Sequence, residues 1–197
     1  MISCAANVNV SNNTGICGAA VNYTVSTSDN CGGATSAQTA GLASGSVFPV
    51  GTTTNSFVAT DAAGNTAACS FTVTVNDTEA PSITCPANVT VSCVAAIPAA
   101  NTGAVGATDN CGVAGIIHVG DVATGTGCAG NARIVVRTYR ATDIYGNSAT
   151  CTQTLTAVAT PVIATASNDV VVFPAYQDSA CATISVVAAG GCGPYTY

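Results

Sequence analysis

Apolar and polar residues alternate with a period of two in short stretches along most of the chain. The clearest stretch is Cys-Ser-Phe-Thr-Val-Thr-Val at 69–75, in which every second residue is apolar. Alternation of this kind places the apolar side chains on one face of a β-strand. Strands are also predicted at 55–60 and 133–142. No convincing helical period occurs, and Val and Thr, which favour strands, surround the alanines, so we predict an all-β fold.

The sequence also repeats itself at an interval of about 80 residues. Three segments recur in the same order: Ile2–Val10 with Ile83–Val91, Asp29–Gly32 with Asp109–Gly112, and Ala59–Asn65 with Ala141–Asn147. The cysteines that follow, Cys69 and Cys151, also match. The register therefore holds across a whole repeat.

Each repeat is predicted to contain about seven short strands with polar turns, the pattern of a β-sandwich. The Asp-x-x-Gly-Asn segments at 61–65 and 143–147 are typical of hairpin turns, because Gly and Asn adopt positive φ readily. We predict tandem sandwiches at 1–76 and 77–159. Residues 160–197 lack the Asp-Asn-Cys segment and are predicted to be a partial third β repeat of a different type.

Charge is scarce and its sign excludes one class of partner. Only 6% of the residues are charged, the formal net charge is −6, and the basic residues are Arg133, Arg137 and Arg140. Nucleic acid needs a basic face, so we expect no nucleic-acid partner, and an anionic membrane surface is disfavoured for the same reason. On the predicted strand Arg133 and Arg137 share one face and Arg140 lies on the other. We expect them to be solvated or paired with acids, and a ligand site there is an alternative.

Catalytic and membrane-spanning signals are absent from the sequence. There is no nucleophile elbow, phosphate loop, Cys-x-x-Cys pair or His-Glu-x-x-His motif, so we predict that the chain is not an enzyme. The single histidine, His118, is predicted to be an ordinary strand residue. No apolar stretch is long and unbroken enough for a transmembrane helix. The start shows no secretory signal, so we expect the chain to be a piece of a longer precursor.

The eleven cysteines indicate an oxidising compartment. Their spacing does not fit a metal site, so we predict disulfides and an extracellular location. Aromatic residues are only 5% of the chain and Trp is absent. Because small side chains remove little apolar area from water, we expect thin cores that depend on disulfides.

With these features in view, the two repeats resemble the hyalin repeat (HYR) family. The matching features are Cys-Pro-x-Asn-Val at 85–89, the Asp-Asn-Cys turn, the Ala-Thr-Asp-x-x-Gly-Asn hairpin and the closing cysteine strand. The resemblance implies an Ig-like fold, an extracellular location and a role in adhesion. The last segment, with Gly-Gly-x-Gly-Pro-Tyr-Thr-Tyr at 190–197, resembles the gliding-adhesin-type (SprB-like) repeats of large bacterial surface adhesins.

Strand positions suggest how the cysteines pair. Cys4 lies on the first strand and Cys69 on the last, so their disulfide would close the first repeat, and by analogy Cys85–Cys151 would close the second. The other predicted pairs are Cys17–Cys31, Cys93–Cys111 and Cys181–Cys192, with Cys111–Cys128 as a rival. The odd count leaves one thiol, which could join chains, pair outside this segment or stay buried.

Two further sites are candidates. Asp77 and Glu79 in the linker, with Asp109 or Asp143, could bind calcium, which prefers several oxygen ligands. Alternatively, four aspartates simply cap turns through their side chains: Asp29, Asp61, Asp109 and Asp143. No other cofactor is expected. Asp-Ser-Ala at 178–180 resembles a bacterial O-glycosylation motif, which makes Ser179 a possible modification site.

The leading hypothesis is an extracellular structural or adhesive segment of a long cell-surface protein, acting as a stiff stalk or adhesin. Its expected partners are neighbouring repeats of the same chain, identical chains, or a surface glycan or protein ligand. One alternative is a subunit of an extracellular filament assembled by β-strand complementation between chains. Another is a carbohydrate-binding module, although the tyrosines are too scattered to indicate an aromatic binding face.

Overall fold

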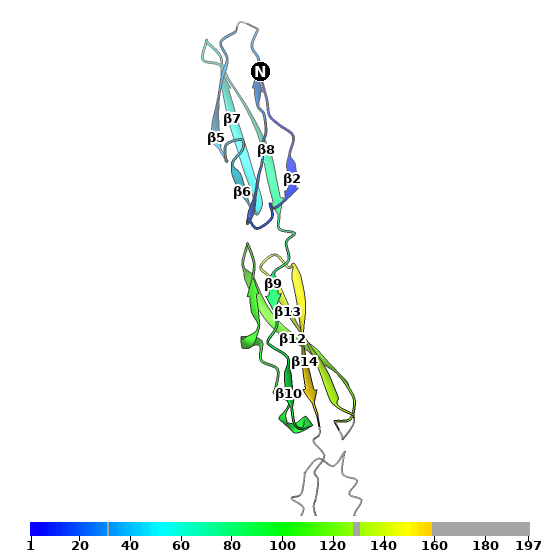
Figure 1. The fold of residues 1–197 in the computed structure, drawn as a ribbon. Helices are drawn as coiled ribbons and strands as arrows, with labels where there is room; N and C mark the ends of the chain where they lie inside the picture. Colours follow the sequence, from blue (N-terminus) through cyan, green and yellow to red (C-terminus); the bar gives the residue numbers. More distant parts are fainter. Residues whose placement is uncertain (31, 128–130, 159–197) are drawn as a thin grey trace, which may run out of the picture. The chain divides into compact units, whose positions relative to one another are not determined.

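The structure is a computed structural model that describes residues 1–30, 32–127 and 131–158 (Figure 1). Within these residues it contains β-strands and two short 3-10 turns but no α-helix. The prediction of an all-β, disulfide-containing fold is therefore confirmed. The predicted third repeat at 160–197, with Ser179 and the Cys181–Cys192 pair, lies outside the described residues.

The first repeat is a sandwich built around one long hairpin. Its strands are β1 (Ile2–Ser3), β2 (Val8–Ser11), β3 (Gly18–Ala20), β4 (Ser26–Thr27), β5 (Thr35–Ala40), β6 (Val47–Pro49), β7 (Gly51–Thr60) and β8 (Thr66–Asn76). One sheet has the order β2-β8-β7-β5, and the pairs β3-β6 and β1-β4 form two smaller sheets. β7 and β8 pair antiparallel along their length, whereas β2 runs parallel to β8.

The hairpin turn after β7 forms because Asp61 binds the backbone that follows it. Asp61 Oδ1 accepts hydrogen bonds from the backbone N–H groups of Ala63 and Asn65, and Oδ2 accepts one from Asn65 Nδ2. Gly64 has a φ of 87°, which a residue without Cβ adopts at little cost. The predicted Asp-x-x-Gly-Asn turn is thus held by its own side chains.

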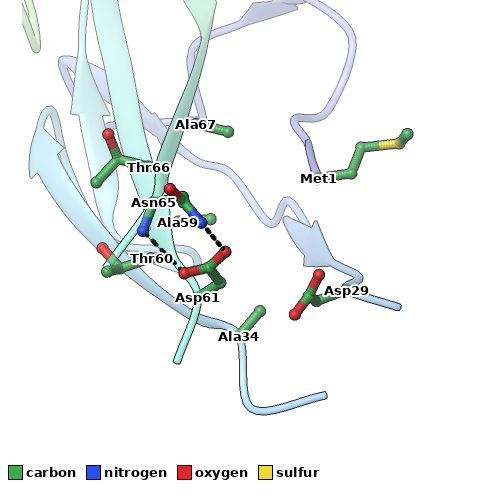
Figure 2. A pocket seen from close by; sticks show the side chains of 9 residues that line it. All are labelled: Met1, Asp29, Ala34, Ala59, Thr60, Asp61, Asn65, Thr66 and Ala67. Atoms are coloured by element: carbon green, nitrogen blue, oxygen red, sulfur yellow. Dashed lines mark hydrogen bonds between the residues drawn. The ribbon is translucent and has the colours of Figure 1, made fainter. Parts of the chain in front are cut away.

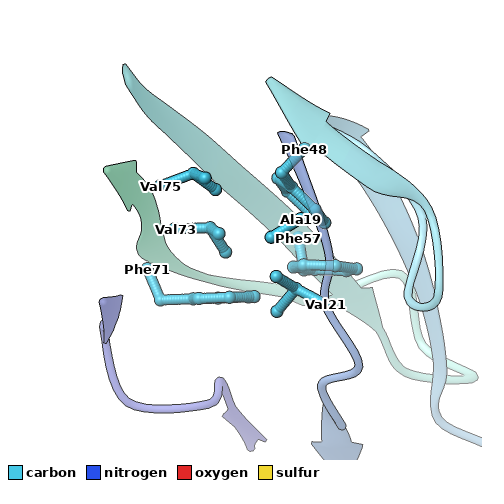
Figure 3. Packing of buried hydrophobic residues seen from close by; sticks show 7 residues of the cluster. All are labelled: Ala19, Val21, Phe48, Phe57, Phe71, Val73 and Val75. Atoms are coloured by element: carbon cyan, nitrogen blue, oxygen red, sulfur yellow. The ribbon is translucent and has the colours of Figure 1, made fainter. Parts of the chain in front are cut away.

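The core of the first repeat holds most of the chain's phenylalanines. Phe57, Phe71, Val73 and Val75 come from the β7–β8 hairpin, and Phe48 packs on them from β6 (Figure 3). Tyr23 adds edge-to-face contacts, the shortest with Phe71 at 4.9 Å between ring centroids. The few aromatic residues of this repeat thus gather in one place, and its core is not built from small side chains alone.

The second repeat uses the same kind of sheet. Its strands are β9 (Ser82–Thr84), β10 (Val89–Val91), β11 (Gly106–Thr108), β12 (Val113–Thr124), β13 (Arg133–Asp143) and β14 (Ser148–Ala157), and its 3-10 turns are η1 (Val94–Ala96) and η2 (Thr102–Ala104). The main sheet has the order β10-β14-β13-β12, with β10 parallel to β14, and β11 pairs with β9.

Polar side chains enter the interior of the second repeat but find partners there. Gln153 stands where the first repeat has Phe71, and only 6% of its surface is exposed. Its Nε2 donates to the backbone oxygen of Ala87 at 2.7 Å. Because the buried amide is hydrogen-bonded, the change from Phe to Gln is tolerated in this fold.

The chain divides into two compact units that differ from the predicted repeats. Unit 1 contains Met1–Pro86, Asn101–Val119 and Tyr139–Cys151, and unit 2 contains Ala87–Ala100, Gly120–Thr138 and the residues from Thr152. Unit 1 thus joins the first repeat to part of the second. The repeat boundaries, at 76/77 and 159/160, stay a prediction.

Candidate functional site

Two disulfides join the first and last strands of the repeats. Cys4 bonds to Cys69 with a Cα–Cα distance of 5.8 Å, and Cys85 bonds to Cys151 with a distance of 5.7 Å. These are the two pairings expected from strand position. Each bridge encloses nearly all of its repeat, since the paired cysteines are 65 and 66 residues apart in sequence.

A third disulfide corrects the predicted pairing. Cys17 bonds to Cys111, with a Cα–Cα distance of 4.8 Å and a sequence separation of 94. The predicted pairs of Cys17 with Cys31 and of Cys93 with Cys111 are therefore wrong, as is the rival in which Cys111 bonds to Cys128. The structural reason is that the bend before β3 lies within bonding distance of the Asp-Asn-Cys turn of the second repeat.

The remaining cysteines are only partly described. Cys93 is a free, half-buried thiol in the structure. Cys31 and Cys128 lie outside the described residues. Sequence reasoning missed the Cys17–Cys111 pair, although one signal was available. Cys17 has no counterpart in the second repeat, so it does not belong to the repeated framework.

The linker next to this disulfide is hydrogen-bonded along its backbone. Glu79 Oε2 accepts from the N–H of Gly15 at 2.8 Å. Asn12 Oδ1 accepts from the N–H of Thr78 at 3.1 Å. From the second repeat, Asn147 Nδ2 donates to the backbone oxygen of Asp77 at 3.3 Å. All of these groups belong to unit 1.

The structure brings together only part of the predicted calcium set. Ligand atoms of Asp77, Asp109 and Cys111 lie within 4.8 Å of one another. The sulfur of Cys111 is already bonded to Cys17, so it is not a thiolate ligand. Glu79 Oε2 instead caps the backbone near Gly15.

Asp143 is the fourth residue of that set, and its carboxylate points into the hairpin turn that follows it. Its Oδ1 accepts from the N–H groups of Tyr145 and Asn147, and its Oδ2 accepts from Asn147 Nδ2 at 2.8 Å. Burial raises the pKa of Asp143, but the Asn147 and Tyr145 donors outweigh it, so its pKa lies below the ordinary value. Asp143 therefore acts as the turn cap that the alternative hypothesis predicts.

The arginines serve the fold of the second repeat. Arg137 is 5% exposed and makes a bidentate ion pair with Asp121, with Nη2–Oδ2 at 2.9 Å. Its Nη1 also donates to the backbone oxygen of Pro98. Arg133 Nη1 donates to the backbone oxygen of Gly125, and Arg140 is exposed. The expected pairing with an acid is thus found for Arg137, which lies on the buried face.

Among the described residues, His118 and one small pocket were the remaining candidates for a site. His118 lies on β12, with its ring centroid 5.8 Å from that of Tyr139, which is 1% exposed.

A pocket of about 100 Å³ lies beside Met1, Asp29 and Asp61 (Figure 2). That volume is well below the roughly 300 Å³ typical of a small-molecule site. Among the described residues, no helix is long and apolar enough to cross a membrane.

Two protocadherin fragments are among the solved structures that match the chain, both with low TM-scores. Human mucin-like protocadherin EC1-2 matches with a TM-score of 0.36 and 12% identity, covering 82% of this chain and 99% of that chain. The protocadherin fragment PcdhgB3 EC1-4 matches with a TM-score of 0.33 and 16% identity, covering 81% of this chain and 50% of that chain.

Sequence comparison finds matches to the first repeat. Hyalin from Strongylocentrotus purpuratus is 37% identical over 91 residues, a match that covers 45% of this chain and 8% of hyalin. The family model of the HYR domain matches residues 1–75. The two matches indicate an extracellular, adhesion-type domain. The match, the sandwich topology and the disulfide framework together support an HYR domain at residues 1–75 of this chain.

Proposed function

We propose that this chain is part of a long extracellular protein in which disulfide-linked repeats form a stiff stalk that presents or carries adhesive surfaces. The observation that carries the proposal is the Cys17–Cys111 disulfide. It adds a second covalent connection to the one that the peptide linker already provides. Two such connections restrict bending at the joint far more than one linker does.

The hydrogen bonds around the linker support the same role. Thr78 and Glu79 bind the first repeat through Asn12 and Gly15, and Asp77 binds Asn147 of the second repeat. A linker whose backbone groups are hydrogen-bonded has few alternative conformations. Pro81, which is buried, fixes φ at the end of the linker. The joint is therefore suited to hold one orientation.

Stiffness is best tested through the rotational motion of the two repeats. In the oxidised chain, ¹⁵N relaxation should give residues of β8 and of β14 the same rotational correlation time. The double variant Cys17→Ser/Cys111→Ser should give two shorter times, because the repeats would then reorient separately. Cys93→Ser is the matched control, since it removes a thiol that is in no disulfide. Independent motion in the unmodified chain would contradict the proposal.

One observation favours the alternative of an extracellular filament. β12 lies at the edge of its sheet, and three of its apolar residues are exposed: Ile117, Val119 and Val122 at 47%, 54% and 68%. An edge strand with apolar side chains can pair with a strand of another chain. A filament subunit should then show concentration-dependent association in light scattering, and Val119→Lys should abolish it. A chain that stays monomeric up to millimolar concentration would refute this alternative.

The carbohydrate-binding alternative has less support. A sugar-binding face usually presents exposed aromatic rings beside polar groups. Among the tyrosines that the structure describes, Tyr139 is buried and Tyr23 packs in the core of the first repeat. Tyr145 is 48% exposed but lies on a hairpin turn.

A further inference from the structure

Two carboxyl groups meet at the joint without a compensating charge. Asp77 belongs to the linker, and Asp109 begins the Asp-Asn-Cys turn that Cys111 fastens to the first repeat. A ligand oxygen of each lies within 4.8 Å of the other. Both residues belong to unit 1.

In each carboxyl group one oxygen is used by the backbone and the other is not. Asp77 Oδ1 accepts from the N–H of Glu79 at 3.1 Å. Asp109 Oδ1 accepts from the N–H groups of Cys111 and Gly112, at 2.8 and 3.0 Å. The Oδ2 atom of each aspartate exposes less than 1 Å² to solvent and has no hydrogen-bond partner. The turns thus fix both side chains and leave one buried oxygen of each without a donor.

Such an arrangement is costly unless a cation is present. Like charges about 5 Å apart repel each other, and removal from water strengthens the repulsion. A buried oxygen that accepts no hydrogen bond also loses the free energy of its hydration. The chain contains no lysine, and Arg133 and Arg137 are hydrogen-bonded elsewhere. Neither of these two arginines therefore neutralises the pair.

The next residue in the turn, Asn110, also has polar atoms without partners. Both side-chain polar atoms of Asn110 are buried and without a hydrogen-bond partner. Buried amides are nearly always hydrogen-bonded or bound to an ion or water, so Asp109 Oδ2 and the Asn110 amide lack partners that a ligand would supply. Carboxylate and amide oxygens are ligands that hard divalent cations prefer, and calcium accepts them with flexible geometry.

We propose that Asp77 and Asp109 bind a calcium ion through their Oδ2 atoms, with the Asn110 side chain, backbone carbonyls and water as further ligands. This site rests on the proposed function, because the ion would tie the linker to the turn already fastened by Cys111. Glu79 and Asp143, the other two residues expected at such a site, are not part of it, since their oxygens cap backbone groups elsewhere.

The expected affinity is modest. Two carboxylates supply less charge than the sites of intracellular calcium sensors, so a dissociation constant on the order of 0.1–1 mM is expected, as in extracellular modules. Magnesium should bind more weakly, because it keeps its water and demands a strict octahedral geometry. The site would then be filled in calcium-rich extracellular fluid.

Calorimetric titration of the full, disulfide-bonded chain with calcium chloride tests the site. The unmodified chain should bind one ion per chain with the stated affinity. Asp77→Asn and Asp109→Asn should each weaken binding at least tenfold, while both keep the Oδ1 atom that caps the turn. Asp29→Asn is the matched control and should leave the affinity unchanged. Equal binding by all four proteins, or no heat up to 10 mM calcium, would overturn the proposal.

Thermal unfolding in the presence of a chelator supplies a second readout. Without calcium, Asp109→Asn should melt no lower than the unmodified chain, because the substitution removes one of two neighbouring carboxylates. With calcium, only the unmodified chain and the control should melt at a higher temperature. A variant that melts well below the unmodified chain in chelator would show that the carboxylate serves the fold rather than an ion. The relaxation experiment tests stiffness separately, so calcium binding and stalk function can fail independently.

Discussion

The Cys4–Cys69 disulfide is expected to supply a large share of the stability of the first repeat. It closes a loop of 65 residues, and in the chain-entropy model closing such a loop contributes about 4 kcal/mol by restricting the unfolded chain. Whole domains are stabilised by only about 5–15 kcal/mol. The double variant Cys4→Ala/Cys69→Ala should therefore lower the free energy of unfolding by about 4 kcal/mol.

Amide hydrogen exchange at Val73 and Val75 measures this loss inside the first repeat. Both residues are almost completely buried on β8, so their amides exchange when the core opens. A loss of about 4 kcal/mol corresponds to exchange that is roughly a thousandfold faster. Cys93→Ala should change these rates little, because the Cys93 thiol is in no disulfide.

The aromatic core offers the competing explanation of stability. Phe71 is 3% exposed, and Phe71→Ala should cost about 3–5 kcal/mol, a loss as large as that from the bridge. If disulfide removal accelerates exchange less than tenfold while Phe71→Ala accelerates it a thousandfold, loop closure is not what stabilises this repeat. Comparable effects would show that the repeat depends on both.

Three further substitutions are predicted to have measurable effects. Gly41→Ala should destabilise by about 2–4 kcal/mol in urea unfolding, since its φ is +91° and an added Cβ would clash with Asn55. Arg137→Met should cost about 2–3 kcal/mol by the same assay, because it leaves the Asp121 carboxylate without its ion pair. Stability should fall as the pH drops below about 4, and Asp143→Asn should weaken that dependence. The folded pKa of Asp143 is lowered, so its stabilising effect is present above the ordinary value of 3.8 and is lost as the pH falls through the folded pKa.

Matched controls separate these effects from general disturbance. Gly51 also has a positive φ, of 112°, but a Cβ added there would meet no atom within 4 Å. Gly51→Ala should therefore destabilise the protein less than Gly41→Ala. Arg140→Met removes an exposed guanidinium and should be nearly neutral. Equal effects in a variant and its control would contradict the corresponding explanation.

The strands and hairpin turns could be predicted because their signals are local. The alternation at 69–75 lies inside β8, where Phe71, Val73 and Val75 are buried and the residues between them are less so. The aspartate at 61 binds groups only two and four residues away. Contacts of such short range leave their pattern directly in the sequence.

The joint could not be predicted in the same way, because its partners are far apart in the chain. Nothing in the residues around Cys17 indicates a partner 94 residues later. The two aspartates that meet there were among the predicted calcium ligands, but the sequence could not separate them from Glu79 and Asp143. That separation depends on which oxygens the folded backbone uses.

The position of the core was also beyond sequence reasoning. The aromatic fraction predicts a thin core everywhere, yet Phe48, Phe57 and Phe71 converge in one repeat. In the second repeat the buried face of β13 carries Arg137 as well as Tyr139. Alternation shows that a strand has two faces, but an arginine on the inner face misleads any prediction of which one is buried.

The bridges between first and last strands determine how the repeats would respond to a pulling force. Tension that enters at the start of the first repeat reaches Cys4, crosses to Cys69 through the sulfur atoms and leaves along β8. While the bridge is intact, the residues between Cys4 and Cys69 cannot be drawn out into an extended chain, which would otherwise span roughly 200 Å. Inside the closed loop, β2 stays paired in parallel with the part of β8 that follows Cys69. A repeat closed in this way keeps most of its length when pulled.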